Sequence, residues 1–202
     1  MSLQLLFAPS AGAPSSSRWM QDFCKRLAVV GRVTCFDYPY QQAGRRSPDR
    51  LPVLVAAHRA AFEALDPEAP VVLIGKSMGG RIGCHLANEL TRRKPLAVVC
   101  LGYPLVGQNG AVRDQVLLAL RIPVLFVQGS RDPLCPLDRL AEVRARMAVA
   151  NDLYVVEGGN HSLELAKTQL KLDPLAQDAV DAAIVRRISG FLKEIAGPNE
   201  GP

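Results

Sequence analysis

One five-residue stretch constrains the fold of this chain more than any other. Ser77 stands two residues from a glycine on either side, Gly75 and Gly79. The stretch follows a short apolar run of branched residues, 71–74, which is typical of a buried strand, and leads into 81–90, where apolar residues recur at helical spacing. A tight turn between a strand and a helix brings backbone close together, so that side chains at the two glycine positions would clash. The pattern therefore predicts a strained strand–turn–helix unit that lifts the hydroxyl of Ser77 clear of a sheet.

Strand-like and helix-like segments alternate along the rest of the chain. The predicted strands are nearly continuous apolar runs at 3–7, 33–36, 71–74, 96–101, 124–128 and 153–156. The predicted helices cover 19–30, 49–65, 81–90, 112–120, 137–147 and 176–195. Apolar strands that alternate with helices are typical of a parallel sheet covered on both faces. The sequence thus predicts an α/β fold, a doubly wound and mostly parallel sheet of about six strands with helices on both faces.

Length, composition and charge restrict the function classes. The 202 residues fit one domain, 1–202, with a tail at 196–202 that contains Gly and Pro and is expected to fray. A chain that is 49% hydrophobic and 21% charged is globular rather than disordered. The formal net charge is +5, the basic residues are mostly scattered, and no aromatic residues interleave with the groups at 45–46 and 92–94. We therefore expect two solvated patches and no nucleic-acid partner.

The cysteines and the N-terminal segment indicate the cellular compartment in which the protein is expected. The five cysteines are odd in number and contain no C-x-x-C pair. They are predicted to be reduced and mostly buried, without a disulfide framework or a metal site; the five are Cys24, Cys35, Cys84, Cys100 and Cys135. The stretch 1–7 is too short for a signal peptide or a membrane span. We expect a soluble, cytoplasmic protein with no membrane partner.

Two loops that follow predicted strands carry further candidate residues. Sheets of this kind bind ligands beyond the carboxyl ends of their strands. Asp132 follows the strand at 124–128, and His161 follows the strand at 153–156. With Ser77 they stand in the order serine, acid, histidine that this fold requires. His161 would take the proton of Ser77 and later give it to the leaving group, while Asp132 would fix the imidazole tautomer and stabilise its cation.

Other titratable residues are alternatives to these three. His58 lies in the middle of a predicted helix and is expected at the surface or half-buried. His85 lies about two turns along the helix behind the serine and is expected to be structural. Glu157 is the nearest rival acid, but it stands too close in sequence to His161. Lys76 precedes the serine, where it would either form a structural ion pair or raise the local positive potential, and the sequence leaves both open.

A hydrolytic serine also needs two backbone N–H groups that stabilise an oxyanion. Met78 is predicted to supply one, because it follows the nucleophile. The other is expected from the small-residue loop after the first strand, from Ala11 by preference and from Gly12 next. The stretch 102–122 is too short for a large cap domain, so the site is predicted to be open. The residues expected to contact substrate are Gly12, Tyr103 and Leu105.

At these motifs the chain resembles the α/β-hydrolase superfamily, and more narrowly the small α/β-hydrolase-like group that includes the Tex and KANL proteins and their bacterial relatives. The matching stretches are 75–81, 102–105, 123–132 and 159–162, and the resemblance extends from about 3 to about 192. It implies that Ser77 is the nucleophile, Asp132 the acid and His161 the base. Relatives often carry His-Gly in the first loop, where this chain has Pro9 and Ser10. Some members of the group look like scaffolds in larger complexes.

These observations predict a serine hydrolase that cleaves an ester, with an amide or thioester as the second choice, through an acyl-enzyme. The expected partner is a small-molecule acyl substrate of short or medium chain length, and no metal or cofactor is implied. The alternative is a non-catalytic binding or scaffold protein on the same fold with an idle triad. Nucleic-acid binding through the basic patches ranks last, and the sequence leaves the oligomeric state open.

Overall fold

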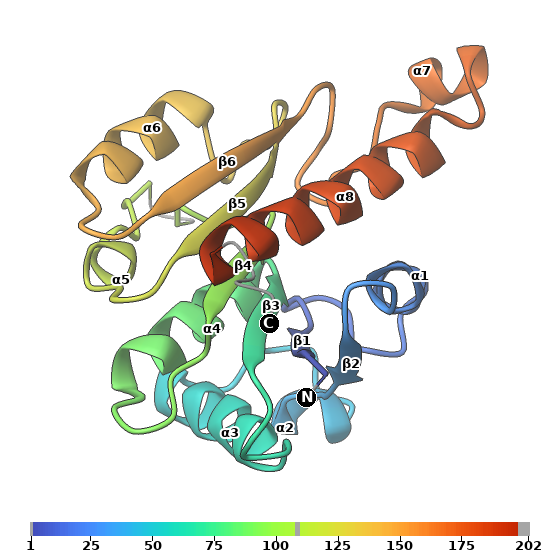
Figure 1. The fold of residues 1–202 in the computed structure, drawn as a ribbon. Helices are drawn as coiled ribbons and strands as arrows, with labels where there is room; N and C mark the ends of the chain where they lie inside the picture. The colour runs from blue at the N-terminus through green and yellow to red at the C-terminus, as the bar shows by residue number, and fades with distance from the viewer. Residues whose placement is uncertain (1, 108–109, 198–202) are drawn as a thin grey trace, which may run out of the picture.

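The computed structural model describes residues 2–107 and 110–197, and within them the strands form one parallel sheet. Figure 1 shows this sheet with helices on either side. The strand order is β2-β1-β3-β4-β5-β6, and all neighbouring strands pair in parallel. The strands are β1 (Gln4–Ala8), β2 (Arg32–Cys35), β3 (Val71–Lys76), β4 (Ala97–Leu101), β5 (Val124–Gly129) and β6 (Asn151–Val156).

The helices cover both faces of the sheet, as the sequence predicts. Helices α1 and α8 pack on one face, and α3, α4, α5 and α6 pack on the other (Figure 1). The helices are α1 (Arg18–Leu27), α2 (Pro39–Gln42), α3 (Leu51–Glu63), α4 (Met78–Glu89), α5 (Gln115–Leu118), α6 (Leu137–Arg146), α7 (Lys167–Leu172) and α8 (Ala176–Ala196). None of the helices within the described residues is long and apolar enough to cross a membrane.

The central strand β3 explains why the strands read as unbroken apolar runs. Val72 and Ile74 belong to the core beneath α1 and α8. Val71 and Leu73 belong to the core beneath α3 and α4. Since alternate side chains of a strand point to opposite faces, a sheet covered on both sides must be apolar at every position.

The structure adds two short helices to the predicted elements. Helix α2 begins with Pro39 in a segment predicted to be a polar loop, and the side chain of Gln41 accepts the backbone N–H of Tyr38 at its start at 3.2 Å. Helix α7 has no buried residue and therefore shows no apolar periodicity in the sequence. The predicted helix at 112–120 is shorter, because only α5 is helical there. The expected fraying of the tail falls mainly on 198–202, which lie outside the described residues.

Two predictions about single residues are wrong. Cys24 of α1 and Cys35 of β2 form a disulfide, so these two are not reduced, whereas Cys84, Cys100 and Cys135 are free and buried as expected. The pair is brought together because α1 packs against the edge strand β2. His58 is fully buried rather than exposed or half-buried. His58 lies on the side of α3 that faces the residues following β2, and the centre of its ring is 5.0 Å from that of Phe36.

Candidate active site

Ser77 occupies the turn between β3 and α4 in a strained backbone conformation. Its φ of 51° and ψ of −112° are rare for a residue with a side chain. Both flanking glycines are required by close backbone contacts. A Cβ at Gly75 would lie 2.1 Å from the backbone nitrogen of Gly80, and a Cβ at Gly79 would lie 2.5 Å from the carbonyl oxygen of Ala8. The structure thus confirms the predicted strained turn, with Ser77 at its apex.

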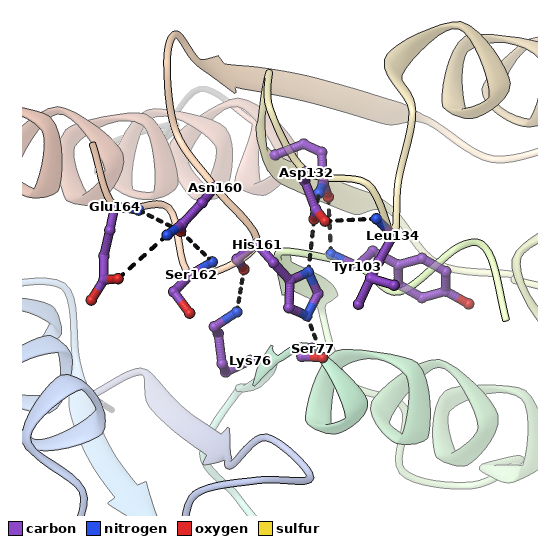
Figure 2. Close-up of polar contacts among 10 residues, drawn as sticks. Lys76, Ser77, Tyr103, Asp132, Leu134, Asn160, His161, Ser162 and Glu164 are labelled. Carbon is purple, nitrogen blue, oxygen red and sulfur yellow. Dashed lines mark hydrogen bonds and ion pairs between the residues drawn. The ribbon is translucent and has the colours of Figure 1, made fainter. Parts of the chain in front are cut away.

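The structure brings the three candidate catalytic side chains together, although they come from separate loops (Figure 2). His161 Nε2 lies 2.8 Å from the hydroxyl oxygen of Ser77, and His161 Nδ1 lies 2.7 Å from a carboxylate oxygen of Asp132. The side chain of Asp132 is fully buried, while that of His161 is 26% exposed. Because a carboxylate only accepts hydrogen bonds, Nδ1 carries the imidazole proton and Nε2 is left to accept the proton of Ser77.

Gln128, near the end of β5, orients the carboxylate of Asp132. Its amide nitrogen donates to the same oxygen that faces His161, and its amide oxygen accepts the backbone N–H of Tyr103 at 2.9 Å. The other oxygen of Asp132 accepts the backbone N–H of Leu134 at 2.9 Å (Figure 2). Sequence reasoning did not assign Gln128 a role. The signal in the sequence is a single amide at the end of an otherwise apolar strand, and the structure shows that this amide is fully buried.

Lys76 supports the loop that carries His161. Its ammonium group donates to the backbone carbonyl of His161 and lies 5.5 Å from the centre of the Trp19 ring. Within the described residues Lys76 forms no ion pair, so its partner is a carbonyl rather than the carboxylate that one interpretation of the sequence expected. Burial lowers the pKa of Lys76 from 10.5 to about 8.

A second contact holds the same loop. The indole N–H of Trp19 donates to the backbone carbonyl of Ser162 at 3.0 Å. The loops after β5 and β6 also approach closely, since a Cβ at Gly129 would lie 2.3 Å from the carbonyl oxygen of Gly159. Asn160 then closes the turn by accepting the backbone N–H of Ser162 at 2.7 Å (Figure 2). His161 is therefore held on both sides before any substrate binds.

A cleft of about 440 Å³ opens at Ser77. The predicted oxyanion donors Ala11 and Met78 both line it, and Met78 is the first residue of α4, where a backbone N–H has no acceptor within the helix. Gly12 instead lines a neighbouring hollow with Tyr40. The complete lining of the cleft is Ala11, Pro48, Asp49, Leu51, Leu54, Ser77, Met78, Arg81, Pro104, Val106, Arg113 and Leu134.

Tyr103 and Leu105 do not line this cleft, although the sequence suggested that they contact substrate. Both side chains are fully buried, and the ring of Tyr103 packs edge-on against that of Phe126. Their neighbours Pro104 and Val106 face the cleft. The extended segment after β4 therefore presents the alternate set of side chains.

Comparisons with known proteins agree with this fold. Among solved structures, the chain is similar to a dienelactone hydrolase from Anabaena variabilis, with 18% identity, a TM-score of 0.67, and 91% of this chain and 83% of that chain covered. It is also similar to an alpha-beta serine hydrolase homologue from Coxiella burnetii, with 16% identity, a TM-score of 0.70, and 92% and 84% covered. A thioesterase from the prodiginine pathway of Streptomyces coelicolor is similar at 17% identity, with a TM-score of 0.61 and 87% and 85% covered.

Similarity to solved structures at these low sequence identities shows only that the fold is shared. A family model described as an alpha/beta hydrolase domain, however, matches residues 1–192. The narrower resemblance to the Tex and KANL group stays a prediction. Since the match spans nearly the whole chain and includes the turn at Ser77 and both loops that face it, this protein belongs to the α/β-hydrolase family.

Proposed function

We propose that this protein is a serine hydrolase that cleaves an ester through an acyl-enzyme on Ser77. The observation that carries the proposal is the unbroken chain of contacts from the hydroxyl of Ser77 through His161 to Asp132, at 2.8 Å and 2.7 Å. A nucleophile within hydrogen-bond reach of a base, which is itself oriented by a third group, is the arrangement that acyl transfer needs. It exists here in the absence of substrate.

In the first half of the reaction, the hydroxyl oxygen of Ser77 attacks the carbonyl carbon of the ester, and its proton passes to Nε2 of His161. Asp132 stabilises the imidazolium that results. The negative charge on the former carbonyl oxygen is stabilised by the backbone N–H groups of Met78 and Ala11. When the intermediate collapses, the bond to the alcohol oxygen breaks, and the alcohol leaves with the proton from Nε2.

In the second half, water attacks the acyl carbon and gives one proton to His161. The bond between that carbon and the oxygen of Ser77 then breaks, the acid is released, and Ser77 recovers its proton from His161. The balance is one ester and one water converted into one acid and one alcohol. A thioester would follow the same steps with a thiol leaving, and the similar fold of a thioesterase makes this the first substrate class to compare.

The shape of the cleft favours short or medium acyl groups. Within residues 2–107 and 110–197 no cap domain covers the triad, and His161 is partly exposed to solvent. The cleft of about 440 Å³ lies at the lower end of the range for small-molecule sites. A long acyl chain would leave much of its apolar surface in water.

The test is steady-state hydrolysis of 4-nitrophenyl acetate, butyrate and decanoate, with the matching thioesters as a second series. We expect butyrate to be preferred over decanoate, and Ser77→Ala to lower kcat by about 10⁴-fold or more. Ser16→Ala, which alters an exposed serine, serves as the matched control and should retain the wild-type rate. A folded wild type that hydrolyses neither series, or a Ser77→Ala variant that keeps the activity, would contradict the proposal and favour a binding role.

A further inference from the structure

Two arginines lie in the same cleft as Ser77. Arg81 follows Ser77 by one turn of α4, and Arg113 comes from the segment between β4 and α5. Both also line an adjoining hollow of about 320 Å³, together with His85. Two guanidinium groups from separate segments thus border one continuous surface next to the nucleophile. Sequence reasoning did not single out either residue.

Neither arginine has a carboxylate partner within the described part of the chain. The polar side-chain contact of Arg81 is with His85 Nε2 at 3.5 Å, and its Nε is buried without a partner. Arg113 is exposed and makes no side-chain hydrogen bond or ion pair among these residues. Six other arginines of the described residues pair with a carboxylate, whereas others, such as Arg131 and Arg186, do not, so it is the position beside Ser77 that distinguishes Arg81 and Arg113; the six are Arg18, Arg26, Arg45, Arg59, Arg146 and Arg187.

The rest of the cleft does not neutralise these two charges. Asp49 is the acid in its lining, but one of its oxygens accepts Arg45 at 2.7 Å and the other accepts the backbone N–H of Tyr40 at 3.0 Å. Burial is the largest cause of the lowered pKa of Arg81; Tyr103 acts next and raises it, the nearby charge of Arg113 lowers it, and Cys84 and Tyr38 have smaller raising effects. A bound anion would relieve both unfavourable effects, because it would supply the missing counter-charge.

We propose that the ester substrate carries an anionic oxygen group, a carboxylate or a phosphate, which Arg81 and Arg113 bind while Ser77 attacks the ester carbonyl. Planar guanidinium groups bind both kinds of oxyanion with paired hydrogen bonds. Ser77 and Arg81 are four residues apart, about 6 Å along the axis of α4, so one small substrate can reach both. This inference rests on the proposed hydrolase function, and it names the substrate class of the same site.

The experiment compares esters that differ only in charge. Monoethyl glutarate carries a carboxylate, ethyl 4-phosphonobutanoate carries a phosphonate, and ethyl glutaramate replaces the charged group with a neutral amide. Monoethyl succinate and adipate vary the spacing, and 4-acetoxybutanoate places the carboxylate on the alcohol side. Acid release at constant pH measures all of them. We expect the best anionic ester to exceed ethyl glutaramate in kcat/KM by about 10- to 100-fold. Whichever of the carboxylate and the phosphonate esters has the higher kcat/KM identifies the preferred anionic group.

Variants then assign the preference to the two arginines. Arg81→Gln and Arg113→Gln should each lower the ratio of kcat/KM between the anionic and the neutral ester by about tenfold, and Arg81→Lys should retain part of it. Arg186→Gln removes one exposed charge from α8, on the opposite face of the sheet, and should keep the wild-type ratio. Because Arg113 is exposed, its variant tests the inference even if Arg81→Gln fails to fold.

The outcomes separate this inference from the function on which it rests. Reaction of wild-type Ser77 with an uncharged fluorophosphonate reports the nucleophile alone. If Ser77 reacts with the fluorophosphonate but the anionic esters are hydrolysed no faster than the neutral ester ethyl glutaramate, the inference is wrong and the hydrolase function stands. An anionic preference that persists in both glutamine variants also overturns it. If Ser77 does not react in the folded protein, the proposed function itself fails.

Discussion

The ammonium group of Lys76 donates a hydrogen bond to the backbone carbonyl of His161, so the residue before Ser77 holds the loop that carries His161. Gly102 makes room for this contact, since a Cβ there would lie 2.4 Å from the same carbonyl oxygen and 3.1 Å from the Lys76 nitrogen. Trp19, whose ring lies beside the Lys76 ammonium, holds the next residue of the loop by donating to the backbone carbonyl of Ser162. The position of His161 is therefore fixed by elements distant in sequence.

The buried charge of Lys76 makes stability depend on pH in the alkaline range. Its pKa is about 8 in the folded protein and ordinarily 10.5. Between these values the unfolded chain binds a proton that the folded protein does not, so stability rises with pH and is lost as pH falls toward 8. Relative to Lys76→Met, the wild type should gain up to about 3 kcal/mol between about pH 7 and pH 10. Urea unfolding at both pH values measures this, and an equal difference at the two would contradict the account.

Asp132→Asn should lower kcat by about 10⁴-fold while leaving the fold intact. An amide in place of the carboxylate can no longer hold the imidazole in the tautomer that accepts the proton of Ser77, nor stabilise its cation. Ester hydrolysis and circular dichroism measure the two properties. Asp138→Asn, an exposed acid on α6, is the matched control. A loss of activity that tracks a loss of folded protein would argue for a structural role instead.

Gln128→Met should separate positioning from binding. The variant loses the contact with Asp132 and leaves the buried N–H of Tyr103 without an acceptor, which destabilises the protein by about 1–3 kcal/mol. Because Gln128 does not line the cleft, kcat should fall by about tenfold while KM stays unchanged. Steady-state kinetics and thermal unfolding measure these effects. A rise in KM at unchanged kcat would mean that Gln128 acts on substrate binding.

His58 should make the protein sensitive to acid. Burial lowers its pKa from 6.5 to about 3, its Nδ1 lies 3.2 Å from the hydroxyl oxygen of Tyr38, and its Nε2 is buried without a hydrogen-bond partner among the described residues. Between these pKa values the unfolded chain binds the extra proton, so stability falls as pH drops below about 6.5. His58→Leu should lose less stability than the wild type between about pH 7 and pH 4, by about 3 kcal/mol. Unfolding curves of both proteins at the two pH values measure this. An equal loss of stability in the wild type and in His58→Leu would contradict the prediction.

The fold can be predicted from the sequence because the apolar strands and the glycines beside Ser77 are determined by local steric and burial requirements. Residues 71–74 must be apolar on both faces, and Gly75 admits no Cβ. The placement of Asp132 and His161 beyond β5 and β6 follows from the same logic, since the carboxyl ends of parallel strands share one edge. The structure brings both to Ser77, and their catalytic roles remain to be measured.

The supporting contacts could not be predicted, because they depend on loops that meet only in the folded chain. Lys76 binds a carbonyl 85 positions away, and Gln128 binds the backbone of Tyr103, 25 positions away. The prediction of which residues line the cleft is wrong for a different reason. An irregular segment has no fixed period, so the sequence does not show that Pro104 rather than Tyr103 faces the cleft. The Cys24–Cys35 disulfide likewise depends on how α1 meets the sheet edge.

The central claim is that Ser77 is a nucleophile activated by His161, and covalent labelling tests it most directly. The folded protein is treated with an uncharged fluorophosphonate, and mass spectrometry locates the adduct. We expect a single adduct on Ser77, absent from Ser77→Ala and strongly reduced in His161→Ala. Absence of an adduct on the folded wild type, or an adduct whose rate of formation is unaffected by His161→Ala, would contradict it.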